Sequence, residues 1–300
     1  MEAHPATAAS IPGQGGRGRV RLPGLGVSLG TGTVVLYLSI IVLLPLAAVA
    51  SEAFTLGLGH FWEQVTSPLA VKSLKLTVVC SLIVVVLNGF FGTILAWLLV
   101  RDDFPGKSVI NAVIDLPFAL PTIVASLVLL SLYGADSPLG IDIAATRAAV
   151  VVALMFVTLP FVVRAVQPLL LEMDREMEAA AASLGAGSFT IFRRIIFPNL
   201  LPGLGAGIAL AFARALGEFG SVLLFAGGLP DTTVTSVFIR NQVESNNLVG
   251  ASAVSMVLLV ASLLLLGCVS LIQRWAIRHD RSSSEFIPTM AKDVGGGGAS

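Results

Sequence analysis

Six long apolar stretches, separated by short polar segments, dominate the chain. About 20 apolar residues are needed for a helix that crosses the hydrocarbon core of a bilayer, and each stretch is long enough. The runs are continuous, which favours helices over the short alternating strands of a membrane barrel. We therefore predict an all-α, polytopic membrane protein with six transmembrane helices. The six helices are predicted at Thr33–Phe54, Leu74–Val100, Val109–Tyr133, Arg147–Leu171, Leu200–Gly227 and Leu248–Arg274.

The polar segments between these stretches indicate how the chain lies in the membrane. Cytoplasmic loops carry an excess of Lys and Arg, and placing the N-terminus inside collects most of these residues on that side. Both termini and the segment between the fourth and fifth helices are then cytoplasmic. We predict flexible tails at residues 1–32 and 276–300, a first helix at 33–54 and a main transmembrane domain at 70–275.

Composition narrows the class of protein further. The 300-residue chain is 55% hydrophobic and 12% charged, with a mean hydropathy of +0.91. Soluble globular domains are about 25% charged, so this chain lacks the polar residues that would cover a water-facing surface. Its 18 basic residues balance 18 acidic ones, which gives no positive excess for nucleic acid. A soluble enzyme and a nucleic-acid binder are excluded, and the expected environment is the lipid bilayer.

The sequence contains no convincing catalytic motif. Gly106-Lys107-Ser108 matches the end of a phosphate-binding loop, but Arg101 stands where the first glycine of that motif is needed. Neither a Ser/His/Asp set nor the spacing of a metal site occurs in the sequence. We therefore expect no catalytic residue, metal or bound cofactor in this chain, and we interpret it as a non-enzyme.

The most informative polar segment runs from residue 172 to 198. Its first part is a strong helix former with an acidic start, which suits the helix dipole, and Gly185 is expected to end that helix. In the second part, Phe189, Phe192 and Ile196 form an apolar stripe on a short amphipathic helix. Two interpretations remain open from the residues alone: a solvated loop lying on the membrane, or a docking surface for a partner.

This segment resembles the EAA loop of type I ATP-binding-cassette (ABC) importer permeases. That pattern is Glu-Ala-Ala, three residues, Gly, nine residues, Ile, one residue and Leu-Pro. Gly185, Ile195 and Pro198 keep the spacing, whereas Ala179 stands in place of Glu and Glu178 comes one residue early. One residue is about 100° around a helix, so Glu178 would make a different contact.

The resemblance implies that this segment couples the chain to a separate ATPase subunit. The residues to which it assigns coupling are Glu178, Ala179, Gly185, Phe189, Phe192, Ile195 and Pro198. It also implies a homologous second permease subunit, two copies of the ATP-binding subunit and an extracytoplasmic sulfate-binding protein. ATP and Mg would then be bound by the ATPase and not by this chain.

From about Leu74 to Arg274 the chain is similar to the sulfate/thiosulfate permease subunits of these importers. The similar segments are 115–122 (DLPFALPT), 137–141 (SPLGI), 213–220 (ARALGEFG) and 234–236 (VTS). The resemblance implies a type I ABC importer permease fold, a location in the bacterial cytoplasmic membrane and import of sulfate or thiosulfate by alternating access. A molybdate or tungstate importer and an ion-driven secondary carrier are the alternatives.

Four charged residues fall well inside the predicted membrane helices, away from the helix ends, where charges are costly and usually face a bundle interior or a polar cavity. Arg214 and Glu218 are spaced i, i+4 on the fifth helix, as a structural pair or a polar patch on the anion path. Asp115 and Arg164 lie at similar depths on neighbouring helices, so they either pair or Arg164 extends to the inner headgroups. All four are candidate translocation-pathway residues.

Overall fold

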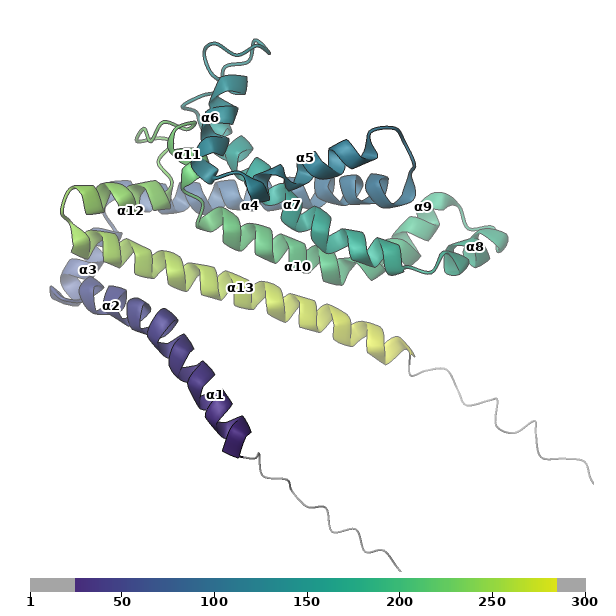
Figure 1. Ribbon diagram of the computed structural model, residues 1–300, viewed down its shortest axis with the longest axis horizontal. Helices are drawn as coiled ribbons and strands as arrows, with labels where there is room; N and C mark the ends of the chain where they lie inside the picture. The colour runs from purple at the N-terminus through teal and green to yellow at the C-terminus, as the bar shows by residue number, and fades with distance from the viewer. Residues whose placement is uncertain (1–24, 285–300) are drawn as a thin grey trace, which may run out of the picture. The chain divides into compact units, whose positions relative to one another are not determined.

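The computed structural model describes residues 25–284 (Figure 1). The described part of the chain is helical and contains no strand. Its helices are α1 (Leu25–Leu38), α2 (Leu44–Ala53), α3 (Gly57–Val65), α4 (Pro68–Arg101), α5 (Lys107–Ala119), α6 (Thr122–Tyr133), α7 (Arg147–Glu172), α8 (Arg175–Ser183), α9 (Ser188–Ile191), α10 (Phe197–Leu216), α11 (Gly220–Leu223), α12 (Thr235–Glu244) and α13 (Leu248–Ser284). Two π-helical turns, η1 (Ser39–Leu43) and η2 (Phe192–Ile196), join α1 to α2 and α9 to α10.

Five helical segments of the described chain are long and apolar enough to cross a membrane: Gly30–Ala53, Pro68–Arg101, Arg147–Glu172, Ser188–Leu216 and Leu248–Cys268. They match five of the six predicted helices. The predicted tails are only partly tested, because residues 1–24 and 285–300 lie outside the described residues. Residues 25–32 and 276–284, which we expected in the tails, belong to α1 and α13.

The prediction of one continuous helix at Val109–Tyr133 is wrong. The chain forms α5 and α6 instead, and the helix breaks at Leu120, which is extended (φ −84°, ψ 133°). A residue that precedes proline is disfavoured in the helical region, and Pro121 follows directly. Helix α6 has 12 residues and is too short to span a bilayer by itself.

The predicted helix at Leu200–Gly227 also ends early, at Leu216. After Gly217 the backbone turns and forms the short helix α11. Side chains replace the helical hydrogen bonds at this break. The Glu218 carboxylate accepts from the Ser221 N–H (2.9 Å), and the Ser126 hydroxyl of α6 accepts from the Phe225 N–H (2.9 Å).

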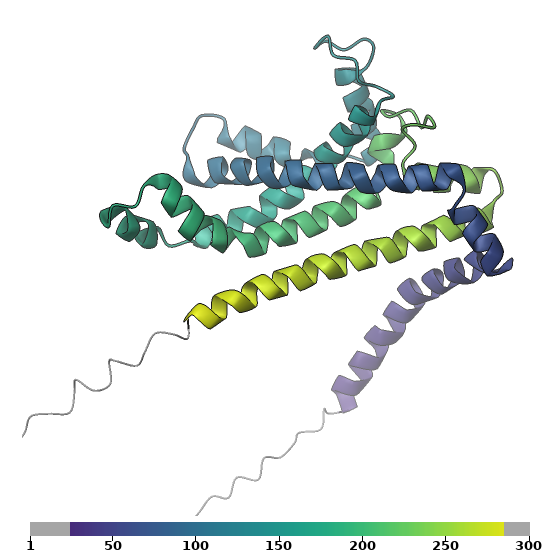
Figure 2. The ribbon, with the colours of Figure 1, turned by 180° about the vertical axis from the view of Figure 1, so that it is seen from behind.

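Helices α4, α7 and α10 pack against one another, and α13 runs along α10 and α12 (Figures 1 and 2). A β-carbon on Gly207 of α10 would lie 2.9 Å from the Ala165 Cβ and 3.0 Å from the Val162 Cα of α7. Only glycine permits so close an approach. The Asn88 side chain of α4 donates to the Thr158 hydroxyl of α7 (2.8 Å), which adds a buried polar link.

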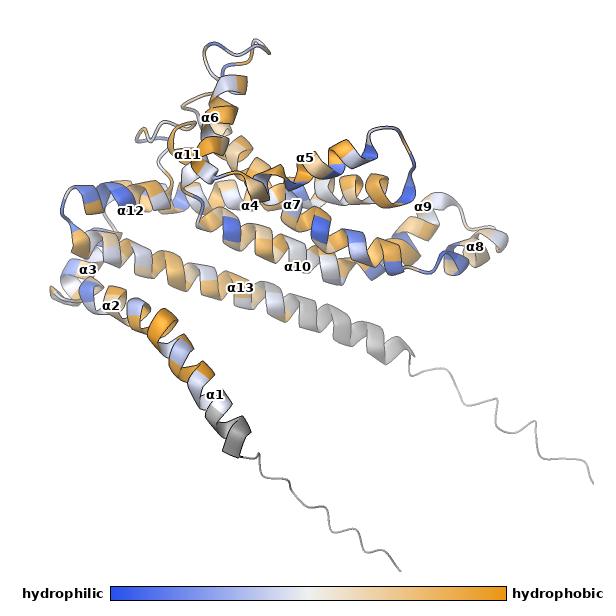
Figure 3. Cartoon of the chain, viewed as in Figure 1, coloured by the Kyte–Doolittle hydropathy of each residue, from blue (hydrophilic) through white to orange (hydrophobic). Residues whose placement is uncertain are grey.

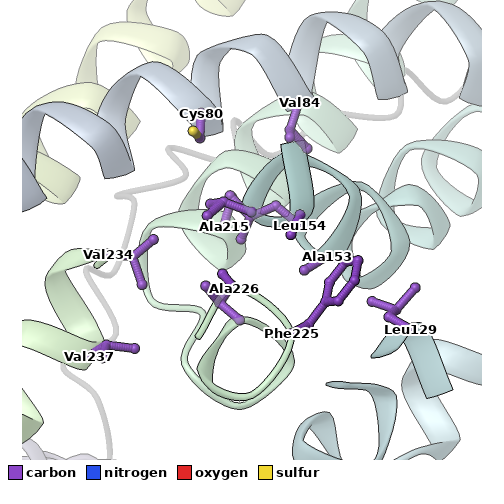
Figure 4. Packing of buried hydrophobic residues seen from close by; sticks show 13 residues of the cluster. Cys80, Val84, Leu129, Ala153, Leu154, Ala215, Phe225, Ala226, Val234 and Val237 are labelled. Atoms are coloured by element: carbon purple, nitrogen blue, oxygen red, sulfur yellow. The ribbon is translucent and has the colours of Figure 1, made fainter. Parts of the chain in front are cut away.

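A large apolar cluster lies where these helices meet the α11 region, and another lies between α4, α5, α7 and α10. Figure 4 shows Leu154 and Ala153 of α7, Phe225 and Ala226 after α11, and Val84 of α4 packed together. Many large apolar side chains on the outside of the helices are exposed, among them Phe90 (63%) and Leu263 (60%). A soluble protein would not show so many, whereas lipid tails cover them in a membrane. Hydrophilic residues gather towards helix ends, for example at α8 and α12 (Figure 3).

Candidate coupling segment and intramembrane charges

Hydrogen bonds close helix α8 at both ends. The Asp174 carboxylate caps its N-terminus by accepting from the Glu176 N–H (2.8 Å). At the other end, Gly185 has a left-handed backbone (φ +87°). Its N–H donates to the Ala182 carbonyl (3.0 Å), and the next N–H donates to the Ala181 carbonyl (3.0 Å). These two bonds form a Schellman motif, so the prediction that Gly185 ends the helix is confirmed.

The second half of the segment differs from the prediction of a separate amphipathic helix. Helix α9 continues through η2 into α10, so residues Ser188–Leu216 form one helical rod. Ile195 and Pro198 are partly buried within this rod. The π-helical turn supplies the continuity that we did not predict, because a wide turn has no simple signal in the apolar pattern.

The apolar stripe of this rod has an inner and an outer end. Ile196 is buried, whereas Phe189 is 75% exposed. Between them, the Phe192 ring packs edge-on against Trp97 of α4, with ring centroids 5.9 Å apart. The stripe therefore fixes the segment to the bundle at one end and leaves an aromatic side chain open at the other.

Glu178 faces the end of α4, where sequence reasoning had not looked for a partner. Its Oε1 accepts from Nη2 of Arg101 at 2.5 Å, and the side chains are 22% and 10% exposed. The Arg101 guanidinium also lies over the Trp97 ring, 5.3 Å from its centroid. Because the two residues are 77 positions apart, no local pattern could have paired them.

The outer surface of the segment exposes apolar side chains beside charged ones such as Arg175 and Arg193. A groove of about 660 Å³ lies along it, lined by Trp97, Glu178, Ala179, Ala182, Ser188, Phe189, Ile191, Phe192 and Ile196. Leu184, which precedes Gly185, is 88% exposed. Sequence reasoning missed Leu184, although a large apolar residue next to a helix-ending glycine in a polar segment was a usable signal. Exposed apolar groups in a water-facing segment are typical of a protein interface.

Arg214 and Glu218 form an ion pair, but Glu218 lies beyond the end of α10. The Glu218 side chain is 1% exposed and its carboxylate also accepts from the Ser221 N–H, while its backbone carbonyl accepts from the Ser236 hydroxyl at 2.5 Å. The Arg214 side chain is 33% exposed. Glu218 therefore holds the turn before α11 in place, and the Arg214 side chain is partly exposed while its partner is buried.

The structure also contains the pair of Asp115 and Arg164, which joins α5 to α7. Arg164 Nε and Nη2 donate to the two Asp115 carboxylate oxygens at 2.9 and 2.5 Å. Arg164 Nη1 donates to the side-chain oxygens of Asn111 (3.2 Å) and Gln167 (2.5 Å). The guanidinium is thus bound to neighbouring side chains and does not extend alone to the headgroups. Asp115 and Arg164 are 49% and 33% exposed.

Residues 88–279 match the protein family described as "Binding-protein-dependent transport system inner membrane component". The chain is 43% identical over 82% of its length to the sulfate transport system permease protein CysT of Synechocystis sp., covering 88% of that protein. It is 41% identical to CysT of Escherichia coli over 84% of this chain and 93% of that protein.

Solved structures agree with this assignment at the level of the fold. A chain of the bacterial alginate ABC transporter, crystallised with its periplasmic protein, superimposes with a TM-score of 0.70 and 16% identity. The match covers 83% of this chain and 93% of that one. The apolar helices, the short segment between α7 and α10 and these similarities lead to one assignment. The chain belongs to the family of inner membrane components of binding-protein-dependent transport systems.

Proposed function

We propose that the chain is a permease subunit of an ATP-driven importer of sulfate and thiosulfate. The observation that carries this proposal is the 41–45% identity to sulfate transport permeases from cyanobacteria and enterobacteria, which extends over four fifths of the chain. The similarity covers the α7–α10 segment as well as the membrane helices. A shared fold alone would not give this level of sequence identity over so much of the chain.

The α8–α9 segment is the proposed contact with a separate ATPase subunit. It combines a rigid turn at Gly185 with two exposed apolar side chains, Leu184 (88%) and Phe189 (75%). Two such anchors beside an apolar groove suit the buried centre of a protein interface. ATP and Mg would be held by the ATPase, and this chain would receive the motion of the closing ATPase dimer through the segment.

The remaining proposed partners are the other components of such an importer. They are a homologous second permease subunit, two copies of the ATPase and an extracytoplasmic sulfate-binding protein. Arg214 is the proposed path residue, since its side chain is partly exposed and its positive charge would offer a dianion one weak electrostatic contact. Asp115 and Arg164 are proposed to line the inner part of the path as a neutralised pair.

The proposed orientation places the α8–α9 segment and both termini in the cytoplasm. It is supported by the excess of Lys and Arg on that side. A cysteine at Ser188 should react only with reagents that reach the cytoplasm, and one at Ser137 only with reagents added outside. The opposite labelling pattern would overturn the orientation and the ATPase contact together.

The decisive experiment is uptake of labelled sulfate by the complete importer in vesicles. We expect uptake that requires ATP and loaded binding protein, that thiosulfate inhibits and that molybdate inhibits weakly. Strong competition by molybdate or tungstate would assign the chain to an importer of those anions. Uptake driven by an ion gradient without ATP would identify a secondary carrier and refute the proposal.

A further inference from the structure

A groove that the proposed function does not use lies at the end of α4 opposite Arg101. It runs along α4 from Lys72 to Ile83, beside the first turn of α7, and has a volume of about 550 Å³. It is lined by the charged residues Lys72, Lys75, Arg147 and Asp231 and by the apolar residues Leu76, Val79, Cys80, Ile83, Ala148 and Val151. Charged and apolar side chains thus share one groove.

The charged end of the groove is positive. Lys72 Nζ lies 2.5 Å from the Asp231 Oδ1, and Arg147 Nη2 lies 3.7 Å from the same oxygen. Lys75 forms no ion pair with any residue in the described part of the chain. Three cations against one carboxylate leave an excess of two positive charges. The Lys72 hydrogen bond and charge, followed by the Arg147 charge, lower the pKa of Asp231, so the carboxylate is ionised at neutral pH.

The apolar part of the groove follows α4 into the membrane. Leu76, Val79 and Ile83 lie on the same face of the helix as Lys72, at intervals of three or four residues. Lys75 and Ile83 are about 12 Å apart along the axis, at 1.5 Å per residue. Half of a hydrocarbon core is about 15 Å thick. With Lys75 at headgroup level, the apolar floor reaches through most of one leaflet, and Val79 and Ile83 are each 44% exposed.

We propose that this groove binds an anionic phospholipid. Its phosphate would lie among Lys72, Lys75 and Arg147, and one acyl chain would lie on Val79 and Ile83. Basic pockets between membrane helices on the cytoplasmic side bind anionic headgroups, and the same attraction between charges would act on a phospholipid of the outer leaflet, where the proposed orientation places this groove. A free inorganic anion would use the cations but not the long apolar floor, so the combination favours a lipid. This inference does not depend on the identity of the transported anion.

The test uses the complete importer in phosphatidylcholine vesicles that contain a minor fraction of a photoreactive lipid. Phosphatidylglycerol with the reactive group on its acyl chain should label residues 76–83 and 148–151 about 25-fold more than phosphatidylcholine carrying the same group, at about fivefold for each of the two excess positive charges. Lys75→Gln should lower this preference about fivefold, because each cation near an anionic headgroup contributes a factor of about that size. Removing all three cations should abolish it.

Two variants distinguish a specific lipid site from a general effect of positive surface charge. Arg240→Gln is the matched control, since Arg240 on α12 is 44% exposed, pairs with Glu244 and does not line the groove. It should leave the preference unchanged. Ile83→Trp should reduce labelling by filling the apolar floor while every cation remains.

Three results would overturn the proposal. The first is equal labelling by the two lipids in the wild type. The second is an equal loss of preference in Arg240→Gln and Lys75→Gln. The third is displacement of the lipid by inorganic sulfate, or protection of the groove by another subunit, which would make it an anion site or a protein interface.

Discussion

Replacing Gly185 with valine tests the turn that separates α8 from α9. Gly185 adopts φ +87°, and no atom lies within 4 Å of the position that a β-carbon would occupy. The cost of Gly185→Val is therefore backbone strain and not a clash. A β-branched residue in the left-handed region costs about 1–3 kcal/mol. At about 1.4 kcal/mol per factor of ten, the native turn becomes about 5- to 150-fold less favoured against alternative turns.

We expect the Gly185→Val protein to insert in the membrane at wild-type amounts, because its apolar helices are unchanged. It should lose the ATPase subunit on purification, or retain it without stimulation by loaded binding protein. Co-purification and ATPase rates measure these two outcomes. Gly185→Asn should be milder, because asparagine tolerates a positive φ.

Gly187 provides a matched control two residues away. Its backbone is extended (φ −72°, ψ 158°), and it also has no atom within 4 Å of a β-carbon. Gly187→Val should therefore keep ATPase binding and stimulation. Wild-type coupling in Gly185→Val, or an equal defect in Gly187→Val, would refute the role assigned to this turn.

Three further predictions concern charged groups. Glu178→Ala removes the carboxylate that pairs with Arg101 and should weaken the attachment of α8 to α4 by about 1–2 kcal/mol, given the partial burial of the pair. Trypsin should then cleave after Arg175 about 5- to 30-fold faster. An unchanged cleavage rate would contradict the pairing. Arg214→Ala should cut sulfate uptake while assembly and ATPase binding persist, whereas loss of assembly in this variant would show that Arg214 has a purely structural role. The pKa of Asp231 is lowered, so its ion pair with Lys72 should persist at neutral pH and be lost only below pH 3.8, the ordinary pKa of an aspartate. Hydrogen exchange of the loop around Asp231 should therefore speed up below pH 3.8 and stay constant between pH 5 and 8.

The apolar pattern was sufficient for the long helices and failed where tertiary contacts replaced helical hydrogen bonds. Pro121 was visible in the sequence, but membrane bundles tolerate proline kinks, and a kink could not be told from a break. The segment that follows α10 and α11 is held by Ser126, whose hydroxyl accepts from the Phe225 N–H, 99 positions away in the sequence. Such a contact has no local signature.

For the candidate site residues, too, local features could be predicted from the sequence and contacts between distant residues could not. Gly185 could be assigned from its neighbours because a helix end is a local event. The pair of Asp115 and Arg164 could be put forward from their similar depths, with extension of Arg164 to the headgroups as the equal alternative, since two predicted helices supply a common axis. The pairing of Glu178 with Arg101 could not be inferred, because α8 lies outside the membrane and has no depth against which to align it.

The unbroken helix Ser188–Leu216 has a mechanical consequence. Its 29 residues form a lever about 43 Å long, at 1.5 Å per residue. A tilt of about ten degrees about the Leu216 end swings the Ser188 end through about 7 Å. If two helices were joined by a flexible loop, part of this displacement would be lost as bending of the loop. The π-helical turn η2 and Pro202 are the points at which this rod can bend. Where it moves as one body, a small rotation beside the Arg214 turn produces a large displacement of the Ser188 end.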